Sequence, residues 1–276
     1  MQVKKNAIAS RLITVITVII GLIWVFPLYW AVNTSLSMDT NTILIPPAFF
    51  PKPILFNAFS YVIKNTTIIR WYFNSIATSL VIVVVVLLIT LMCAYVLSQM
   101  KFPGSKAILI AILAGFMIPT ATNVVPLFML LNNFNLVNTY WGLVLPQLAA
   151  PIAVVIYKQF FDQMPQEMSD AAKMDGAGEY RILFRIFLPL NWGISWALAI
   201  VLFIWSWNNF FWPFIIINDT SKMTIPVGIT QVQSWYGIAY PRQLASAVLA
   251  ALPTAILYLI FQRRVAQGVA ITSGIK

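Results

Sequence analysis

The feature that most constrains this chain is a succession of apolar segments, each long enough to cross a bilayer. The first covers residues 12–32, follows a basic head at residues 1–11 and contains no Asp, Glu, Lys or Arg. Crossing the hydrocarbon core as a helix takes about 20 apolar residues. Five more such segments follow, at residues 73–98, 107–131, 141–161, 192–217 and 244–261. The sequence therefore predicts an all-α membrane protein with six transmembrane helices.

Composition supports this fold class and excludes others. Of the 276 residues, 61% are hydrophobic and 9% are charged, and a soluble domain cannot bury that much apolar surface. With no His and one Cys, a transition-metal site is not expected. The net charge of +10 comes without a basic run containing interleaved aromatics, so nucleic-acid binding is not expected. A cleaved signal peptide, the alternative for residues 12–32, is disfavoured because the apolar run is too long and lacks a small-x-small cleavage site.

Lys and Arg are distributed unevenly between the two sides of the membrane. If both termini, the turn at residues 101–106 and the interval 162–190 share one side, that side holds twelve basic residues and the other holds five. The positive-inside rule makes the first side cytoplasmic. We therefore expect the head, the interval 162–190 and the tail 263–276 in the cytoplasm. The opposite side would hold a proline-rich loop with a short helix near Ala58–Lys64, and a second loop at residues 218–242.

The interval Asp162–Leu190 is the longest polar stretch between strongly apolar segments, and it carries five of the seven acidic residues of the chain. Pro165 suits the first turn of a helix, since its missing N–H is unsatisfied there anyway. No helix breaker follows from Gln166 to Met174. Asp175-Gly176 is a turn signal, and Gly176 stands where helices often end with positive φ. We expect a short helix that ends at this turn.

A second amphipathic helix is expected after the turn. Its predicted apolar face consists of residues spaced i, i+3, i+4 and i+7, namely Tyr180, Leu183, Phe184 and Phe187. Pro189 is expected to end this helix. The residues alone leave two interpretations of the whole interval equally open: a plain connecting hairpin between two spans, and a docking surface for a soluble partner.

The same interval contains, in this order, Asp170-Ala171-Ala172, Met174-Asp175-Gly176-Ala177, Phe184 and Leu188-Pro189-Leu190. This order resembles the E-A-A loop of bacterial ABC-importer membrane subunits, and most closely that of the sugar-importer branch. Asp170 stands where the family usually has Glu, which keeps the charge and shortens the side chain by one methylene. The ending, Gln262-Arg263-Arg264 with Ser273-Gly274-Ile275-Lys276, is similar to that of the second permease of maltose-type importers.

The resemblance implies a type I ABC-importer permease in the bacterial inner (plasma) membrane. Its partners would be a homologous sister permease, two ATPase subunits and an extracytoplasmic solute-binding protein. The loop would act as a coupling helix in a cleft of the ATPase. The docking residues carried over by the motif are Glu167, Asp170, Ala171, Ala172, Asp175, Gly176 and Ala177.

No catalytic constellation is present, so the chain is expected to be a transport subunit rather than an enzyme. None of the six segments has an ionisable residue in its central part. Intramembrane charges mark ion and proton pathways, and their absence argues against transport driven by protons or sodium. Energy would come from a partner ATPase that binds ATP and Mg, with no cofactor in this chain. The alternatives are the same fold importing another polar solute, a self-contained facilitator or channel, and a non-transporting scaffold.

An aromatic and amide-rich stretch near the end of segment 192–217 is the candidate substrate pathway. It contains Trp205, Trp207, Asn208, Asn209 and Phe211. Aromatic rings pack on the C–H faces of sugars, and amides bond their hydroxyls. From the residues alone, an interfacial aromatic belt is the favoured alternative. The resemblance of Trp207-Asn208 with Pro213 to the W-N-x-x-x-x-P stretch of sugar-importer permeases supports the pathway.

Overall fold

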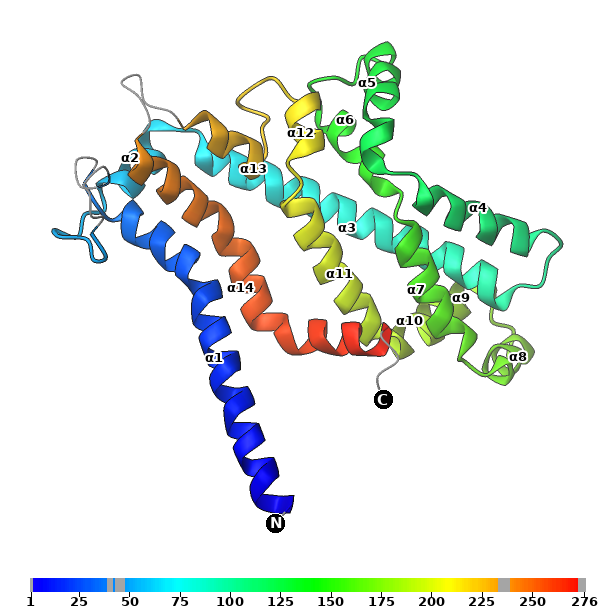
Figure 1. Ribbon diagram of the computed structural model, residues 1–276. Coiled ribbons are helices and arrows are strands. Elements are labelled where there is room, and N and C mark those ends of the chain that lie inside the picture. The colour runs from blue at the N-terminus through cyan, green and yellow to red at the C-terminus, as the bar shows by residue number, and fades with distance from the viewer. Residues whose placement is uncertain (1, 39–41, 43–47, 233–238, 273–276) are drawn as a thin grey trace. The chain divides into compact units, whose positions relative to one another are not determined.

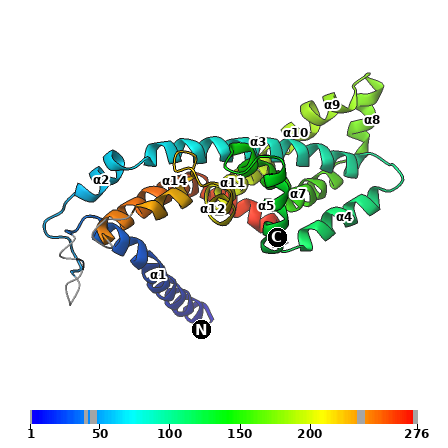
Figure 2. The same cartoon turned by 90° about the horizontal axis from the view of Figure 1, so that it is seen from above.

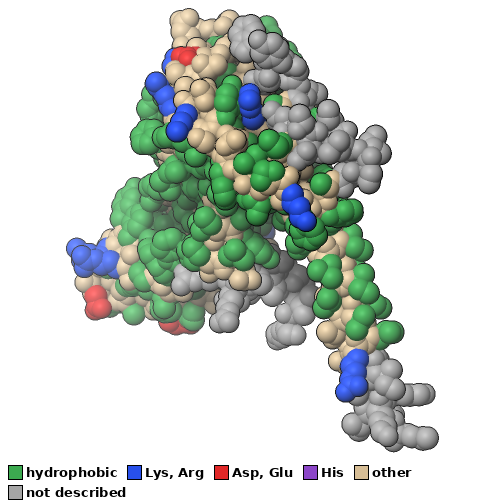
Figure 3. All heavy atoms as spheres, turned by 90° about the vertical axis from the view of Figure 1, so that its left-hand side faces the viewer, with side chains coloured by type: hydrophobic (Ala, Val, Ile, Leu, Met, Phe, Trp, Pro, Cys, Tyr) green, Lys and Arg blue, Asp and Glu red, His purple; other side chains and the backbone are tan. Residues whose placement is uncertain are grey.

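The computed structural model describes residues 2–38, 42, 48–232 and 239–272, and for residues 2–9, 120 and 263–272 it describes the backbone alone. Within these ranges every regular element is helical (Figure 1). The chain forms two compact units, one made of Met1–Ile68 with Gly228–Leu252 and the other of Ile69–Val227 with Pro253–Lys276. Hydrophobic side chains cover much of the visible molecular surface (Figure 3), as expected for a protein whose solvent is lipid.

The first unit contains α1 (Gln2–Ser35), α2 (Asn57–Asn65), η5 (Ile229–Gln231) and the first part of α14 (Tyr240–Thr272). The expected short helix near Ala58–Lys64 is α2. The Arg242 guanidinium lies 3.9 Å from the centre of the Tyr61 ring, which connects α14 to α2. Residues 10–28 of α1 are all exposed, whereas Asn33, Thr34 and Ser35 at its C-terminal end are buried.

The second unit is built on the long helix α3 (Ile68–Gln99). Beside it lie α4 (Ser105–Met117), α7 (Pro151–Asp162) and α11 (Trp192–Trp207). Between these longer helices come η2 (Thr120–Asn123), α5 (Val124–Asn133), α6 (Tyr140–Val144) and η3 (Leu145–Leu148). After α11 come α12 (Phe211–Ile216) and α13 (Ile225–Gly228). The aromatic core joins Tyr95 of α3 to Phe161 of α7, at 6.3 Å between ring centres.

Among the described residues, three helices are long and apolar enough to span a membrane, and six spans result if each bent helix pair counts as one. The predicted segment 107–131 is interrupted between Met117 and Val124, around Pro119. The predicted segment 141–161 bends by 42° between η3 and α7, which begins with Pro151. Proline explains these breaks, since it lacks the donor for the helical hydrogen bond.

The predicted segment 192–217 is not one continuous helix. The helix α11 ends at Trp207 and α12 begins at Phe211. Pro213 accounts for the break, because in a continuous helix its ring would collide with the carbonyl of Asn209. In the first turn of the new helix α12 the proline is tolerated, since the N–H it lacks would have no intrahelical partner.

The second helix of the polar interval differs from its prediction. It consists of α9 (Glu179–Ile182), a π-helical turn η4 (Leu183–Phe187) and α10 (Leu188–Leu190). Pro189 does not end it, because the wider π turn contains Arg185, whose carbonyl the proline would otherwise meet. The chain instead bends by 82° after Leu190, and α11 begins at Trp192.

The π turn also changes which side chains of this helix are buried. Ile182, Leu183 and Phe187 are buried, whereas Tyr180 is 75% exposed and Phe184 is 37% exposed. The predicted apolar face was therefore wrong at Tyr180 and Phe184. A regular period of 3.6 residues does not hold across a π turn, which shifts the following residues around the helix axis.

Candidate functional site: a docking loop at the end of the long helix

The helix α8 (Gln166–Met174) has the bounds expected from the sequence. Pro165 lies just before it rather than in its first turn. Glu167 stands in the first turn and Lys173 in the last turn, where both charges interact favourably with the helix dipole. Ser169 is the one buried residue of α8, and Glu167, Asp170 and Ala171 are exposed. The helix thus presents a polar, small-residue surface away from the protein.

Gly176 ends this helix in the manner that its sequence predicts. Its φ is +75°, the left-handed conformation that side chains with a Cβ adopt at a cost. The Ala177 amide donates to the Ala172 carbonyl at 2.9 Å, and the Gly176 amide donates to the Lys173 carbonyl at 3.0 Å. This pair of bonds is a Schellman motif. Asp175 and Gly176 are exposed within it, while Ala172 and Ala177 are half-buried.

The inner side of α8 meets the end of α3 through Glu179. The Tyr95 hydroxyl donates to Glu179 Oε2 at 2.6 Å, and Lys173 Nζ lies 2.9 Å from Glu179 Oε1. The hydrogen bonds from Tyr95 and then Lys173 lower the pKa of the Glu179 carboxyl. Sequence reasoning did not count Glu179 among the site residues. Its contact with Tyr95 spans 84 positions of sequence, and no local pattern reveals it.

A cavity of about 410 Å³ lies next to this contact, between the end of α3 and α8. Its lining residues are Gln99, Met100, Lys101, Gln166, Ser169, Asp170, Lys173 and Glu179. In Figures 1 and 2, α8 and α9 lie together near the C-terminal end of α3. Polar side chains from α8 and from the end of α3 therefore surround a cavity between the two helices.

The candidate pathway residues point in different directions. Trp207 is 1% exposed and stacks on Phe203 at 5.9 Å between ring centres, whereas Trp205 is 65% exposed. Phe211 is 54% exposed, and the Asn208 amide donates to the Ile204 carbonyl of its own helix. The Asn209 amide donates to Gln147 Oε1 at 2.8 Å. The structure thus places Trp207 inside this unit and leaves Trp205 and Phe211 on its surface.

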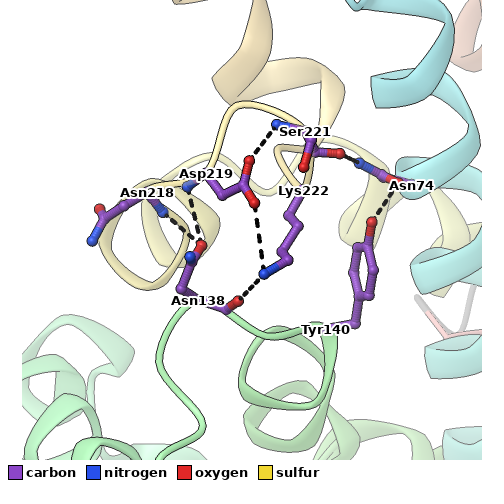
Figure 4. Close-up of polar contacts among 7 residues, drawn as sticks. All are labelled: Asn74, Asn138, Tyr140, Asn218, Asp219, Ser221 and Lys222. Carbon is purple, nitrogen blue, oxygen red and sulfur yellow. Dashed lines mark hydrogen bonds and ion pairs between the residues drawn. The ribbon is translucent and has the colours of Figure 1, made fainter.

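A polar network that sequence reasoning missed holds the loop after α12 (Figure 4). The Asn74 side chain on α3 is 3% exposed. Its amide donates to the Ser221 and Met223 carbonyls, at 2.9 Å each, and its Oδ1 accepts from the Tyr140 hydroxyl at 2.9 Å. The Trp71 indole N–H donates to the Thr220 carbonyl at 2.7 Å. The start of this loop is therefore fixed to α3.

Asn138 fixes the same loop from the other side. Its φ is +60°, and its Oδ1 accepts from the amides of Asn218 and Asp219 at 3.2 and 3.0 Å. Lys222 Nζ donates to the Asn138 carbonyl at 3.0 Å and lies 3.6 Å from Asp219 Oδ2. Hydrogen bonds from the side chain and amide of Ser221 lower the pKa of the Asp219 carboxyl. The sequence gives one local signal for this arrangement, since Asn tolerates the left-handed conformation.

The helical fold, with the exposed α8 between two apolar segments, agrees with the membrane permease expected from the sequence. The chain belongs to the family of binding-protein-dependent transport system inner membrane components, whose pattern it matches over residues 87–271. It is therefore a multi-pass membrane protein and a transport component rather than an enzyme.

Curated relatives align along nearly the whole chain. One is the arabinooligosaccharides transport system permease protein AraQ of Halalkalibacterium halodurans, which is 35% identical over 100% of both chains. The diacetylchitobiose uptake system permease protein NgcG of Streptomyces coelicolor is 32% identical over 95% of this chain and 87% of its own. The sn-glycerol-3-phosphate transport system permease protein UgpE of Agrobacterium fabrum is 28% identical over 96% and 97%.

A solved structure shares the fold. It is that of a bacterial ABC transporter involved in the import of the acidic polysaccharide alginate. The two chains superpose with a TM-score of 0.80, covering 92% of this chain and 97% of the other, at 20% sequence identity. The expected fold, an ABC-importer permease, is thereby confirmed.

Proposed function

We propose that this chain is one of two permease subunits of an ATP-driven importer for a sugar or oligosaccharide. It forms half of the translocation pathway and couples to an ATPase through the loop Asp162–Leu190. The observation that carries this proposal is α8, which ends in a Schellman turn at Gly176 and exposes five of the seven residues of the docking motif, namely Glu167, Asp170, Ala171, Asp175 and Gly176. A helix that only connects two spans does not require an exposed surface of this composition.

The partners in this proposal are a sister permease, two ATPase subunits and an extracytoplasmic binding protein. ATP binding closes the ATPase dimer, α8 moves with it, and the spans tilt to open the pathway outward. Both termini lie in the cytoplasm, as the distribution of Lys and Arg favours. The ATPase, not this chain, binds ATP and Mg.

A neutral hydroxylated substrate is favoured by the apolar segments themselves, which lack ionisable residues in their central parts. The named functions of AraQ and NgcG support an oligosaccharide. The named function of UgpE keeps a second candidate, a small polar phosphate ester. Uptake of an arabinose oligosaccharide and of sn-glycerol-3-phosphate by the reconstituted importer distinguishes the two.

Affinity purification of the detergent-solubilised chain, followed by mass spectrometry, tests the proposal. An ATPase and a second permease should purify with the native chain from cells that express its neighbouring genes. Gly176→Val should lose the ATPase alone, because Val is strained at φ +75°. A native chain that purifies by itself would contradict the proposal and favour a self-contained facilitator.

A further inference from the structure

Glu179 joins three elements that would otherwise meet across a cavity. It is the first residue of α9, and its two carboxylate oxygens have different partners. Oε1 faces Lys173 in the last turn of α8 at 2.9 Å, and Oε2 accepts from the Tyr95 hydroxyl of α3 at 2.6 Å. Glu179 therefore links α8 to α3, next to the buried Ser169 of α8, which also interacts with Tyr95.

The α3 end of this link is rigid. Tyr95 is 2% exposed, and its ring packs edge-on against Phe161 and Phe187 at 6.3 and 5.1 Å between centres. Both phenylalanines are fully buried. Close-packed aromatic rings do not reorient independently, so a force on the Tyr95 hydroxyl acts on α3 as a whole.

The α8 end of the link is less closely packed. A cavity of about 410 Å³ lies between α8 and the end of α3, and Ser169 is the one residue of α8 that is buried there. Lys101, Ser169 and Asp170 also line this cavity. The short hydrogen bond and the ion pair resist separation of Glu179 from its two partners when α8 is displaced.

We propose that Glu179 is a positioning residue that transmits movement of the docking helix α8 to α3 through Lys173 and Tyr95. This inference rests on the proposed function, since it assumes an ATPase that moves α8. It adds to the docking motif a residue that lies behind the docking surface and contacts the membrane helix. Without the link, α8 follows the ATPase and α3 stays in place.

The single cysteine of the chain provides the readout. Cys93 lies on α3, two residues before Tyr95, and is half-buried. In the reconstituted complex of this chain with its sister permease and ATPase, the rate of its alkylation by N-ethylmaleimide is measured with and without a non-hydrolysable ATP analogue. In the native complex the analogue should change the rate several-fold, because α3 moves.

Tyr95→Phe removes one oxygen and keeps the aromatic packing, and Glu179→Gln removes the charge that holds Lys173. In both variants the ratio of the two alkylation rates should approach one while the ATPase still purifies with the chain. Tyr258→Phe, which changes a tyrosine 53% exposed on α14, is the matched control and should keep the native ratio. A purely structural role would change both rates together and leave their ratio intact.

The remaining outcomes separate this inference from the proposed function. If the native chain purifies without an ATPase, the proposed function fails. If the ATPase is present but the native ratio is one, or if both variants keep the native ratio, Glu179 does not transmit movement. Loss of assembly in both variants would likewise overturn the inference, since Glu179 would then be needed for the fold of the docking loop.

Discussion

Replacing Asn74 with Ala should release the loop after α12 from the long helix. The Asn74 side chain makes three hydrogen bonds, two to the carbonyls of Ser221 and Met223 and one with the Tyr140 hydroxyl. It is 3% exposed, so water does not easily replace the lost partners. At about 1 kcal/mol for each bond, the local loss is about 2–3 kcal/mol.

This loss of local free energy raises the rate of amide hydrogen exchange in the loop, because the loop opens more often. Since 1.4 kcal/mol is a factor of ten, local opening of the loop should become about 30- to 150-fold more frequent. The amides to follow are those of Ser221 and Ile225, which donate to Asp219 Oδ1 and Ser75 Oγ. Exchange is measured by mass spectrometry on the purified protein in detergent.

Tyr140→Phe is the matched control, because it removes only one of the three bonds and should raise exchange by about 5-fold. The order expected is native, Tyr140→Phe and then Asn74→Ala. An Asn74→Ala variant whose loop exchanges within about 3-fold of the native rate would refute the reasoning, since the loop would then be held by other contacts.

Three further predictions follow from the site. Gly176→Val should cost about 1–2 kcal/mol of local backbone strain and lose the ATPase in co-purification, whereas Gly178→Ala, at φ −77° with no atom within 4 Å of the new Cβ, should retain it. Trp207→Ala should destabilise the fold by about 3–5 kcal/mol, measured by thermal unfolding. Trp205→Ala should change stability little, and loss of substrate uptake in this variant would support the pathway role of Trp205. Hydrogen bonds lower the pKa of the Glu179 carboxyl in the folded protein. Its contribution to stability should therefore be complete above the unfolded pKa of about 4.3 and should disappear as the pH falls through the lower folded pKa. A Glu179→Gln variant whose unfolding shows the same acid dependence as the native protein would contradict this assignment.

Local chemistry made the bounds of α8 predictable from the sequence. Pro165 and Gly176 mark its two ends by backbone rules that act within a few residues. The face of the following helix was not predictable in the same way. Its π turn shifts the period, and this leaves Tyr180 exposed where a regular helix would have placed it beside Phe187.

Contacts between distant parts of the chain were beyond sequence reasoning. Glu179 and Tyr95 each look ordinary in their own segments, and only the folded chain brings them together. The aromatic stretch shows the same limit. Trp205 and Trp207 are two positions apart on one helix, yet packing against neighbouring helices buries the Trp207 ring and leaves the Trp205 ring exposed.

The 82° bend after Leu190 gives the docking loop a mechanical property. From Glu179 to Leu190 the chain forms a nearly perpendicular arm, about 18 Å long at 1.5 Å per residue. A rotation of about 10° at the bend moves the far end of this arm by about 3 Å, the length of a hydrogen bond. Glu179 stands at that far end. A small change of angle at this bend therefore corresponds to a displacement of about one hydrogen-bond length at Glu179.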